Sequence, residues 1–250
     1  MLVTEWFAAR WMKMFFGMEW SKMNNREYIN KSSTNKSSTE QGKIIPLFST
    51  PVMKISLGRE FTKDETDCFQ NIPITDRDNF ATSTNHQSKD FFLFDNFAEE
   101  LKDIKKFIEF YLKQYLEEIQ GVDTNLANLR ITQSWLNKTK PGESHDSHSH
   151  HNSYLSGVLY IKCLPNDCIN LKNRLHKSYN NIEFPKKKIT PWNTQGVIVG
   201  VKKEDLILFP SWVPHSVNRN ETKDKERISL AFNTFPVGKM GDEDGTKLIL

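Results

Sequence analysis

Residues 145–162 read HDSHSHHNSYLSGVLYIK and join a cluster of histidines to a short apolar run. Four of the seven histidines of the chain, His145, His148, His150 and His151, lie in this cluster. The run that follows is rich in Val, Leu, Ile and Tyr, which is typical of a β-strand. In an extended segment, side chains two positions apart point to the same face, so His148 and His150 can approach one ion. Imidazole suits iron, zinc, copper and nickel, so the pair His148 and His150 predicts a metal ion but not which metal it is.

The segments around this stretch indicate a mainly β domain. One long helical pattern, 95–120, carries apolar residues at three- and four-residue steps, and Gly121 is placed to end it. After it come five short apolar or alternating runs separated by polar, Gly- or Pro-bearing turns: 129–137, 153–163, 194–202, 205–210 and 227–235. Several such strands indicate a sandwich or barrel. The predicted fold class is α+β, mainly β.

The chain divides into three parts by composition. Residues 1–43 combine an amphipathic N-terminal segment with a polar linker. We expect the segment to dock as a helix on the body of the protein; the alternative is a helix that lies on a membrane surface. The linker repeats NKSST and is expected to be disordered, since it cannot bury enough apolar surface to offset its chain entropy. Residues 44–238 form the predicted domain, and residues 239–250 form a C-terminal tail.

Charge and cysteine content exclude several classes of protein. The 34 basic and 31 acidic residues give a net charge of +3, so there is no clear signal for nucleic-acid binding. The three widely spaced cysteines form neither a disulfide framework nor a zinc motif, and a reducing, cytoplasmic setting is expected. Charged residues interrupt the apolar N-terminus, so we expect neither a secretory signal nor a transmembrane segment there.

A third metal ligand should come from another strand, and His215 in DLILFPSWVPHSVN (205–218) is the candidate. Twelve residues later Arg227 opens the strand RISLAFN, in which Arg227 and Ser229 share one face. A guanidinium in a β core needs an anionic partner, because burying it unpaired is very costly. A bound carboxylate gripped bidentately would meet that need. The plainer alternatives are a polar histidine loop without chemistry and a surface ion pair of Arg227 with Glu226 or Asp224.

The ordered set of H-x-H, FPSW-x-x-H and R-x-S resembles the Fe(II)- and 2-oxoglutarate-dependent oxygenase superfamily. Within it, the chain is similar to a bacterial and phage branch related to the prolyl hydroxylases. The resemblance implies a double-stranded β-helix, or jelly roll, braced by N-terminal helices. It also implies metal ligation by His148 and His215, and binding of the distal carboxylate of 2-oxoglutarate by Arg227 with the help of Ser229.

Position 150 departs from that resemblance. The superfamily usually has Asp or Glu there, completing two histidines and a carboxylate around the metal. We expect His150 to be the third ligand; the alternative is a two-histidine site completed by water or a small anion. Side chains alternate between the two faces of a strand, and this alternation adds four residues to the predicted pocket lining: Trp135, Asn137, Tyr160 and Asn233.

The resemblance implies an enzyme that uses Fe(II), 2-oxoglutarate and O₂ to hydroxylate a small-molecule or peptide substrate, with release of succinate and CO₂. Neither the substrate nor the oligomeric state can be read from the sequence. Two alternatives remain: a cupin-like metalloprotein that does not use 2-oxoglutarate (an isomerase, small-molecule dioxygenase or sensor), and a non-catalytic jelly-roll binding module. The R-x-S strand argues against both, because neither needs a buried arginine twelve residues beyond the metal histidine.

Overall fold

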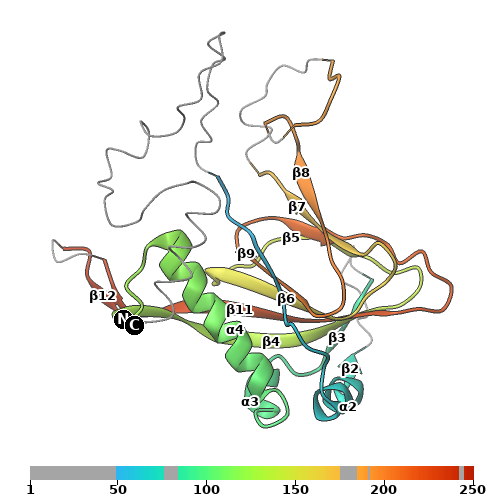
Figure 1. Cartoon of the computed structure of the whole chain (residues 1–250), viewed down its shortest axis with the longest axis horizontal. Helices are drawn as coiled ribbons and strands as arrows, with labels where there is room; N and C mark the ends of the chain where they lie inside the picture. The colour runs from blue at the N-terminus through green and yellow to red at the C-terminus, as the bar shows by residue number, and fades with distance from the viewer. Residues whose placement is uncertain (1–48, 76–83, 175–184, 191, 242–244) are drawn as a thin grey trace. The chain divides into compact units, whose positions relative to one another are not determined.

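Two antiparallel sheets form the body of the computed structural model, which describes residues 49–75, 84–174, 185–190, 192–241 and 245–250 (Figure 1). The predicted N-terminal segment and linker lie outside these residues. The helices are α2 (Lys63–Asn71), α3 (Leu93–Asn96), α4 (Lys102–Gln114) and the π-helical turn η2 (Tyr115–Gln120). The strands are β1 (Met53–Ser56), β2 (Ile74–Thr75), β3 (His86–Ser88), β4 (Ala127–Thr139), β5 (His145–His148), β6 (Leu155–Lys162), β7 (Cys168–Lys172), β8 (Gly196–Gly200), β9 (Asp205–Pro210), β10 (His215–Val217), β11 (Arg227–Met240) and β12 (Leu248–Ile249).

From β4 to β11 the chain passes back and forth between the two sheets. The large sheet has the order β1-β9-β6-β11-β4-β3-β2, with β12 paired to β11, and the small sheet has the order β5-β10-β7-β8. Strands β4, β6, β9 and β11 therefore belong to the large sheet, and β5, β7, β8 and β10 to the small one. This alternation is a double-stranded β-helix, which confirms the predicted jelly roll.

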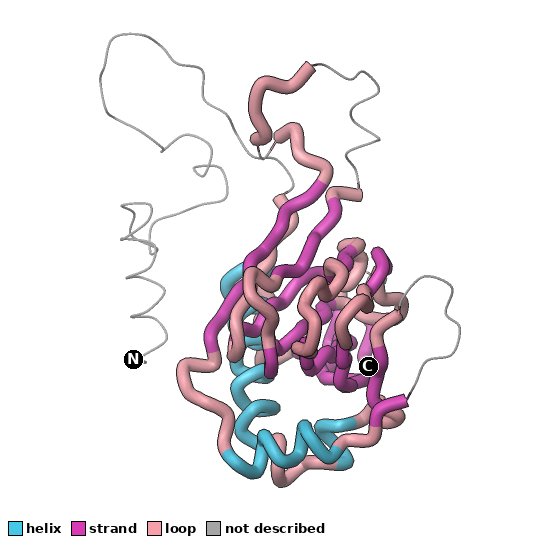
Figure 2. The backbone as a smooth tube through the Cα atoms, turned by 90° about the vertical axis from the view of Figure 1, so that its right-hand side faces the viewer, coloured by secondary structure: helices cyan, strands magenta, loops and turns pink. Residues whose placement is uncertain are grey.

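The helices cover the outer face of the large sheet. Ile104, Ile108 and Leu112 of α4 are fully or almost fully buried in one apolar cluster with leucines of β4, β6, β9 and β11. Figure 1 shows α4 lying across these strands, and Figure 2 shows the helices gathered on one side of the strands. Burying that apolar stripe stabilises the sheet from outside and leaves its inner face for the cleft described below.

The predicted helix 95–120 is interrupted. The structure divides it into α3, α4 and η2, with a turn at 97–101 between the first two. Its end at Gly121 is as expected, because Gly121 has a φ of +67°, a left-handed conformation that glycine adopts without the steric cost of a Cβ. Residues 239–250, expected to form a tail, include the end of β11 and strand β12, whose Leu248 and Ile249 pair with Met240 and Lys239.

Gly157 of β6 faces Phe232 of β11, which is completely buried. A Cβ atom at position 157 would lie 2.1 Å from the Phe232 ring, so Gly157→Ala must displace a ring in the middle of the core. We expect this substitution to lower the free energy of unfolding by about 3 kcal/mol, as overpacking of a rigid core does. Denaturant unfolding measures the change. Gly200→Ala in β8 is the control, because a Cβ there meets nothing within 4 Å; equal midpoints for the two variants would contradict the packing described.

Among the described residues, no helix combines the length and apolarity that crossing a membrane requires.

Candidate metal centre

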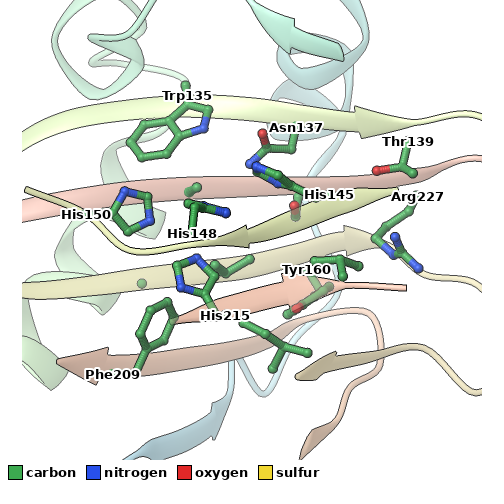
Figure 3. A pocket seen from close by; sticks show the side chains of 16 residues that line it. Trp135, Asn137, Thr139, His145, His148, His150, Tyr160, Phe209, His215 and Arg227 are labelled. Atoms are coloured by element: carbon green, nitrogen blue, oxygen red, sulfur yellow. The ribbon is translucent and has the colours of Figure 1, made fainter. Parts of the chain in front are cut away.

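Three imidazoles from two separated stretches meet between the sheets. His148 ends β5 and His215 begins β10, and the two residues are direct partners across this antiparallel pair. His150 lies two residues beyond β5, where its backbone N–H donates to the Ser211 carbonyl at 2.9 Å. The possible ligand atoms of His148, His150 and His215 all lie within 4.8 Å of one another. Figure 3 shows the three rings turned toward one another, which is what a shared ion requires.

Hydrogen bonds to the backbone fix the tautomer of two of these rings. Nδ1 of His148 lies 2.8 Å from the Asp146 carbonyl oxygen, and Nδ1 of His215 lies 3.1 Å from that of Val213. A carbonyl oxygen only accepts, so Nδ1 carries the proton in both rings and donates it. Nε2 then keeps its lone pair for a metal, an arrangement that also fixes the ring orientation.

Burial keeps the rings of His150 and His215 neutral. It lowers the pKa of His150 to about 4, and the neighbouring His148 and His151 lower it further. Burial likewise lowers the pKa of His215 to about 2, with additional contributions from His148 and His150. At neutral pH His150 and His215 are therefore unprotonated, and their lone pairs are available as ligands.

The low pKa of His150 predicts acid sensitivity of the metal-free protein. An unfolded imidazole titrates near 6.5, so between pH 6.5 and 4 the unfolded chain binds a proton that folded His150 does not. The free energy of unfolding should fall over this range, by roughly 3 kcal/mol from His150 alone, at about 1.4 kcal/mol per pKa unit. Chemical unfolding in the presence of a chelator at a series of pH values measures this loss. A His150→Gln variant should lose less stability on acidification; parallel losses in the two proteins would contradict the prediction.

A buried ion pair lies at the other end of the same cleft. Arg227 opens β11 and is 4% exposed, and Asp167, in the turn before β7, is 5% exposed. Nε of Arg227 lies 2.8 and 2.7 Å from the two Asp167 oxygens, and Nη2 lies 2.5 Å from Oδ1. The third nitrogen, Nη1, is buried and has no hydrogen-bond partner among the described residues. The anion that a buried Arg227 was predicted to need is thus first of all Asp167, a residue that no motif in the sequence marks.

Inward-facing side chains of three adjacent strands line the cleft in rows. Ser229 of β11 pairs with Asn137 of β4 and with Tyr160 of β6, and Ala231 pairs with Trp135 in the next row. With these residues and Arg227, the lining includes the three clustered histidines and His145, whose ring stacks on His148 at 4.2 Å. The space between the side chains, open mouth included, is about 520 Å³.

Two of the lining residues carry buried donors that find no acceptor among the described residues, Tyr160 Oη and Trp135 Nε1. Burial, and then the charge of Asp167, raise the pKa of the Tyr160 phenol, so it keeps its proton and can donate. Asn233, which strand parity also placed in the lining, is not among the residues that form it. Its amide is engaged elsewhere, with the oxygen 2.8 Å from Ser156 Oγ and the nitrogen 3.3 Å from Gln133 Oε1.

The region of the chain that forms this cleft matches a known protein family. Residues 133–233, which include all three clustered histidines and Arg227, match the family model described as "Putative 2OG-Fe(II) oxygenase". The match runs from within β4 to within β11, so it is a likeness of the double-stranded β-helix to the 2OG-Fe(II) oxygenase superfamily. The superfamily is named for 2-oxoglutarate and Fe(II), and its members are oxidoreductases that use O₂.

Solved oxygenase structures resemble the chain at low sequence identity. A 2OG-Fe(II) oxygenase family oxidoreductase from Burkholderia pseudomallei is 10% identical, with 68% of this chain and 76% of that chain covered and a TM-score of 0.45. A prolyl-4-hydroxylase from Pseudomonas putida is 16% identical, with coverage of 75% and 94% and a TM-score of 0.46. HygX from Streptomyces hygroscopicus, with nickel, 2-oxoglutarate and hygromycin B bound, is 13% identical, with coverage of 74% and 82% and a TM-score of 0.43. No curated protein matches the sequence.

The donor set of the cleft fits the metal for which that superfamily is named. Three imidazoles within ligand distance of one another form a set that iron accepts, although nickel, copper and zinc accept it too. The position that usually supplies a carboxylate in the superfamily is His150 here. Its ring centroid lies 5.1 Å from those of both His148 and His215, within the same cluster as the other two rings.

Proposed function

We propose that this chain is an Fe(II)- and 2-oxoglutarate-dependent dioxygenase in which His148, His150 and His215 hold the iron. Arg227 and Tyr160 would bind the distal carboxylate of 2-oxoglutarate, with Ser229 beside them. The observation that carries the proposal is the pairing of two features in one cleft. Three imidazoles converge at one end, and a guanidinium and a phenol with unpartnered buried donors line the rest of the cleft.

The unpartnered donors are the strongest argument for an acidic ligand. Leaving a buried donor unsatisfied costs about 1–3 kcal/mol, and more when the group is charged. Nη1 of Arg227 and Oη of Tyr160 would both be satisfied by one carboxylate, through charge-assisted hydrogen bonds. Ser229 is paired directly with Tyr160 across the sheet, so its hydroxyl lies next to that carboxylate position.

The residues of the chain supply orientation and a dry environment. The imidazoles would keep the metal at one end while Arg227 and Tyr160 fix the far end of the cosubstrate, so its oxo acid end is presented to the metal in one orientation. The rings of Trp135 and Phe209 line the cleft beside His150 and His215 and limit access of water. Iron, when bound, supplies the activation of O₂ that couples conversion of 2-oxoglutarate to succinate and CO₂ with substrate oxidation. We propose hydroxylation of a small-molecule or peptide substrate.

A second candidate function is a metal enzyme of cupin type that does not use 2-oxoglutarate. The ion pair of Arg227 with Asp167 favours it, because the guanidinium already has an acid partner without any ligand. The free Nη1 favours the first candidate, since the ion pair leaves that nitrogen unused.

Succinate formation tests the proposal. Aerobic incubation with Fe(II), ascorbate and 2-oxoglutarate should yield succinate even without substrate, at the slow rate of uncoupled turnover, and mass spectrometry detects the product. His148→Ala should give none, whereas His86→Gln, which removes a histidine outside the cleft, should match the wild type. Metal-loaded wild type that forms no succinate would favour the second candidate.

A further inference from the structure

His150 differs from the other two clustered histidines in how it is held. His148 and His215 belong to strands β5 and β10, and the ring of each donates to a backbone carbonyl oxygen. His150 lies two residues beyond β5, and no hydrogen bond to another of the described residues fixes its ring. A neutral imidazole offers a metal one lone pair, whereas a carboxylate offers about four lone-pair sites. An imidazole at position 150 must therefore be oriented by the loop that carries it.

The loop 149–154, which joins β5 to β6, is tied to the end of β9. It turns at Asn152, which has a φ of +54°, a left-handed conformation in which Asn is enriched. The backbone N–H of His150 donates to the Ser211 carbonyl at 2.9 Å, and the N–H of Ser211 donates to the Tyr154 carbonyl at 3.1 Å. Ser211 directly follows β9 and is completely buried, so its backbone bonds both ends of the loop.

Three serine hydroxyls connect the same loop to the large sheet. Oγ of Ser211 lies 2.7 Å from that of Ser153, in the loop, and 2.8 Å from that of Ser156, in β6. Ser156 Oγ donates to Oδ1 of Asn233 at 2.8 Å, and the amide nitrogen of Asn233 donates to Gln133 Oε1. Each hydroxyl has one proton to donate, so Ser211 donates to Ser156 and Ser153 donates to Ser211. The hydroxyls thus form a chain of hydrogen bonds with a single direction, from the loop to β11.

We propose that Ser211 is a positioning residue for His150, and that the hydroxyl chain it completes holds the loop so that the imidazole faces the metal. The inference rests on the proposed function, because it takes His150 as a ligand. Removing the Ser211 hydroxyl takes from Ser153 its acceptor at 2.7 Å and from Ser156 the hydrogen bond that it accepts. The loop then loses its side-chain link to the buried end of β9, and the ring of His150 is less strictly oriented toward the other two.

The Ni(II) affinity of Ser211→Ala, measured by competition with a chromophoric chelator, tests this role. Binding should weaken by about tenfold or more, as it does when groups that orient metal ligands are removed. Ser88→Ala is the matched control. Ser88 is completely buried outside the cleft, and its hydroxyl also makes two hydrogen bonds, donating to the Asp90 carbonyl at 2.6 Å and accepting from the Leu136 N–H at 3.0 Å. This variant should lose a similar amount of stability and bind Ni(II) as the wild type does.

The same substitution in a His150→Ala background separates positioning from a general loosening of the site. There Ser211→Ala should change the Ni(II) affinity by less than about twofold, since the ligand that it positions is already gone. An equal loss of affinity in both backgrounds would overturn the inference, because the hydroxyl would then act on the whole site. Unchanged affinity in a folded Ser211→Ala would overturn it as well.

Ser153→Ala provides the test from the loop side if Ser211→Ala does not fold, because Ser153 is only partly buried. It should weaken Ni(II) binding by at least about threefold, and an affinity equal to that of the wild type would overturn the inference. The variant His150→Ala distinguishes this failure from failure of the proposed function. If His150→Ala binds Ni(II) as tightly as the wild type, the proposed ligand set is wrong; if it binds more weakly while the serine variants do not, only the role of Ser211 is wrong.

Discussion

Replacing His215 with alanine is expected to weaken metal binding by at least about a hundredfold, more than the loss of a residue that merely orients a ligand. His215 is 4% exposed and lies between His148 and Phe209, with ring centroids 4.3 and 4.7 Å away, so its imidazole is held in place by packing on both sides. Ni(II) is a suitable redox-stable probe, and competition with a chromophoric chelator measures its dissociation constant.

His86→Gln is the control for this experiment. His86 begins β3, is partly buried and lies 2.7 Å from Glu143, but it does not line the cleft. It should bind Ni(II) as the wild type does. Equal affinity of His215→Ala and the wild type would show that the imidazole cluster is not the metal site.

Replacing Arg227 with glutamine is expected to abolish measurable binding of 2-oxoglutarate while leaving metal binding intact. The substitution removes the Nη1 donor and leaves Asp167 buried without its cation, which typically costs 2–5 kcal/mol. Part of that cost falls on folding, so the melting temperature should drop as well. Calorimetry with 2-oxoglutarate and the Mn(II)-loaded variant measures the loss of binding.

Arg59→Gln separates ligand binding from stability. Arg59 makes a comparable two-nitrogen contact with buried Glu65, at 2.8 and 2.6 Å, at the start of α2 and outside the cleft. This variant should also lose stability, yet bind 2-oxoglutarate as tightly as the wild type. If both arginine variants lost the cosubstrate equally, the loss would reflect weakened folding and Arg227 would have no place in the binding site.

The parts of the fold that could be predicted are those that a local pattern encodes. The apolar runs of β6, β9 and β11 are long enough to show a strand pattern, and the large sheet follows from them. Strands β5 and β10 have four and three residues, too few for a periodic signal. Their histidines could still be selected, because H-x-H and the histidine after Pro214 are recognisable without knowing the strands.

The parts that could not be predicted depend on contacts between distant residues. Asp167 lies 60 positions before Arg227 in a polar turn with no motif of its own, and only the crossing of β6 to β7 brings it to the guanidinium. Asn233 has the parity of the cleft residues, but the tertiary contacts of its amide decide where it is used. Parity specifies the face of a strand and not how far along that face a cleft extends.

Calorimetric titration of 2-oxoglutarate into the protein under anaerobic conditions, with and without Mn(II), tests whether the two ends of the cleft bind one ligand. Three imidazoles at one end of the cleft and the Arg227–Tyr160 donors at the other should act on one ligand together. We expect one molecule to bind per chain, strongly with the metal and at least about tenfold more weakly without it, since the metal and the donors share the ligand. Metal-loaded protein that binds no 2-oxoglutarate, or binds it equally well without metal, would contradict the account.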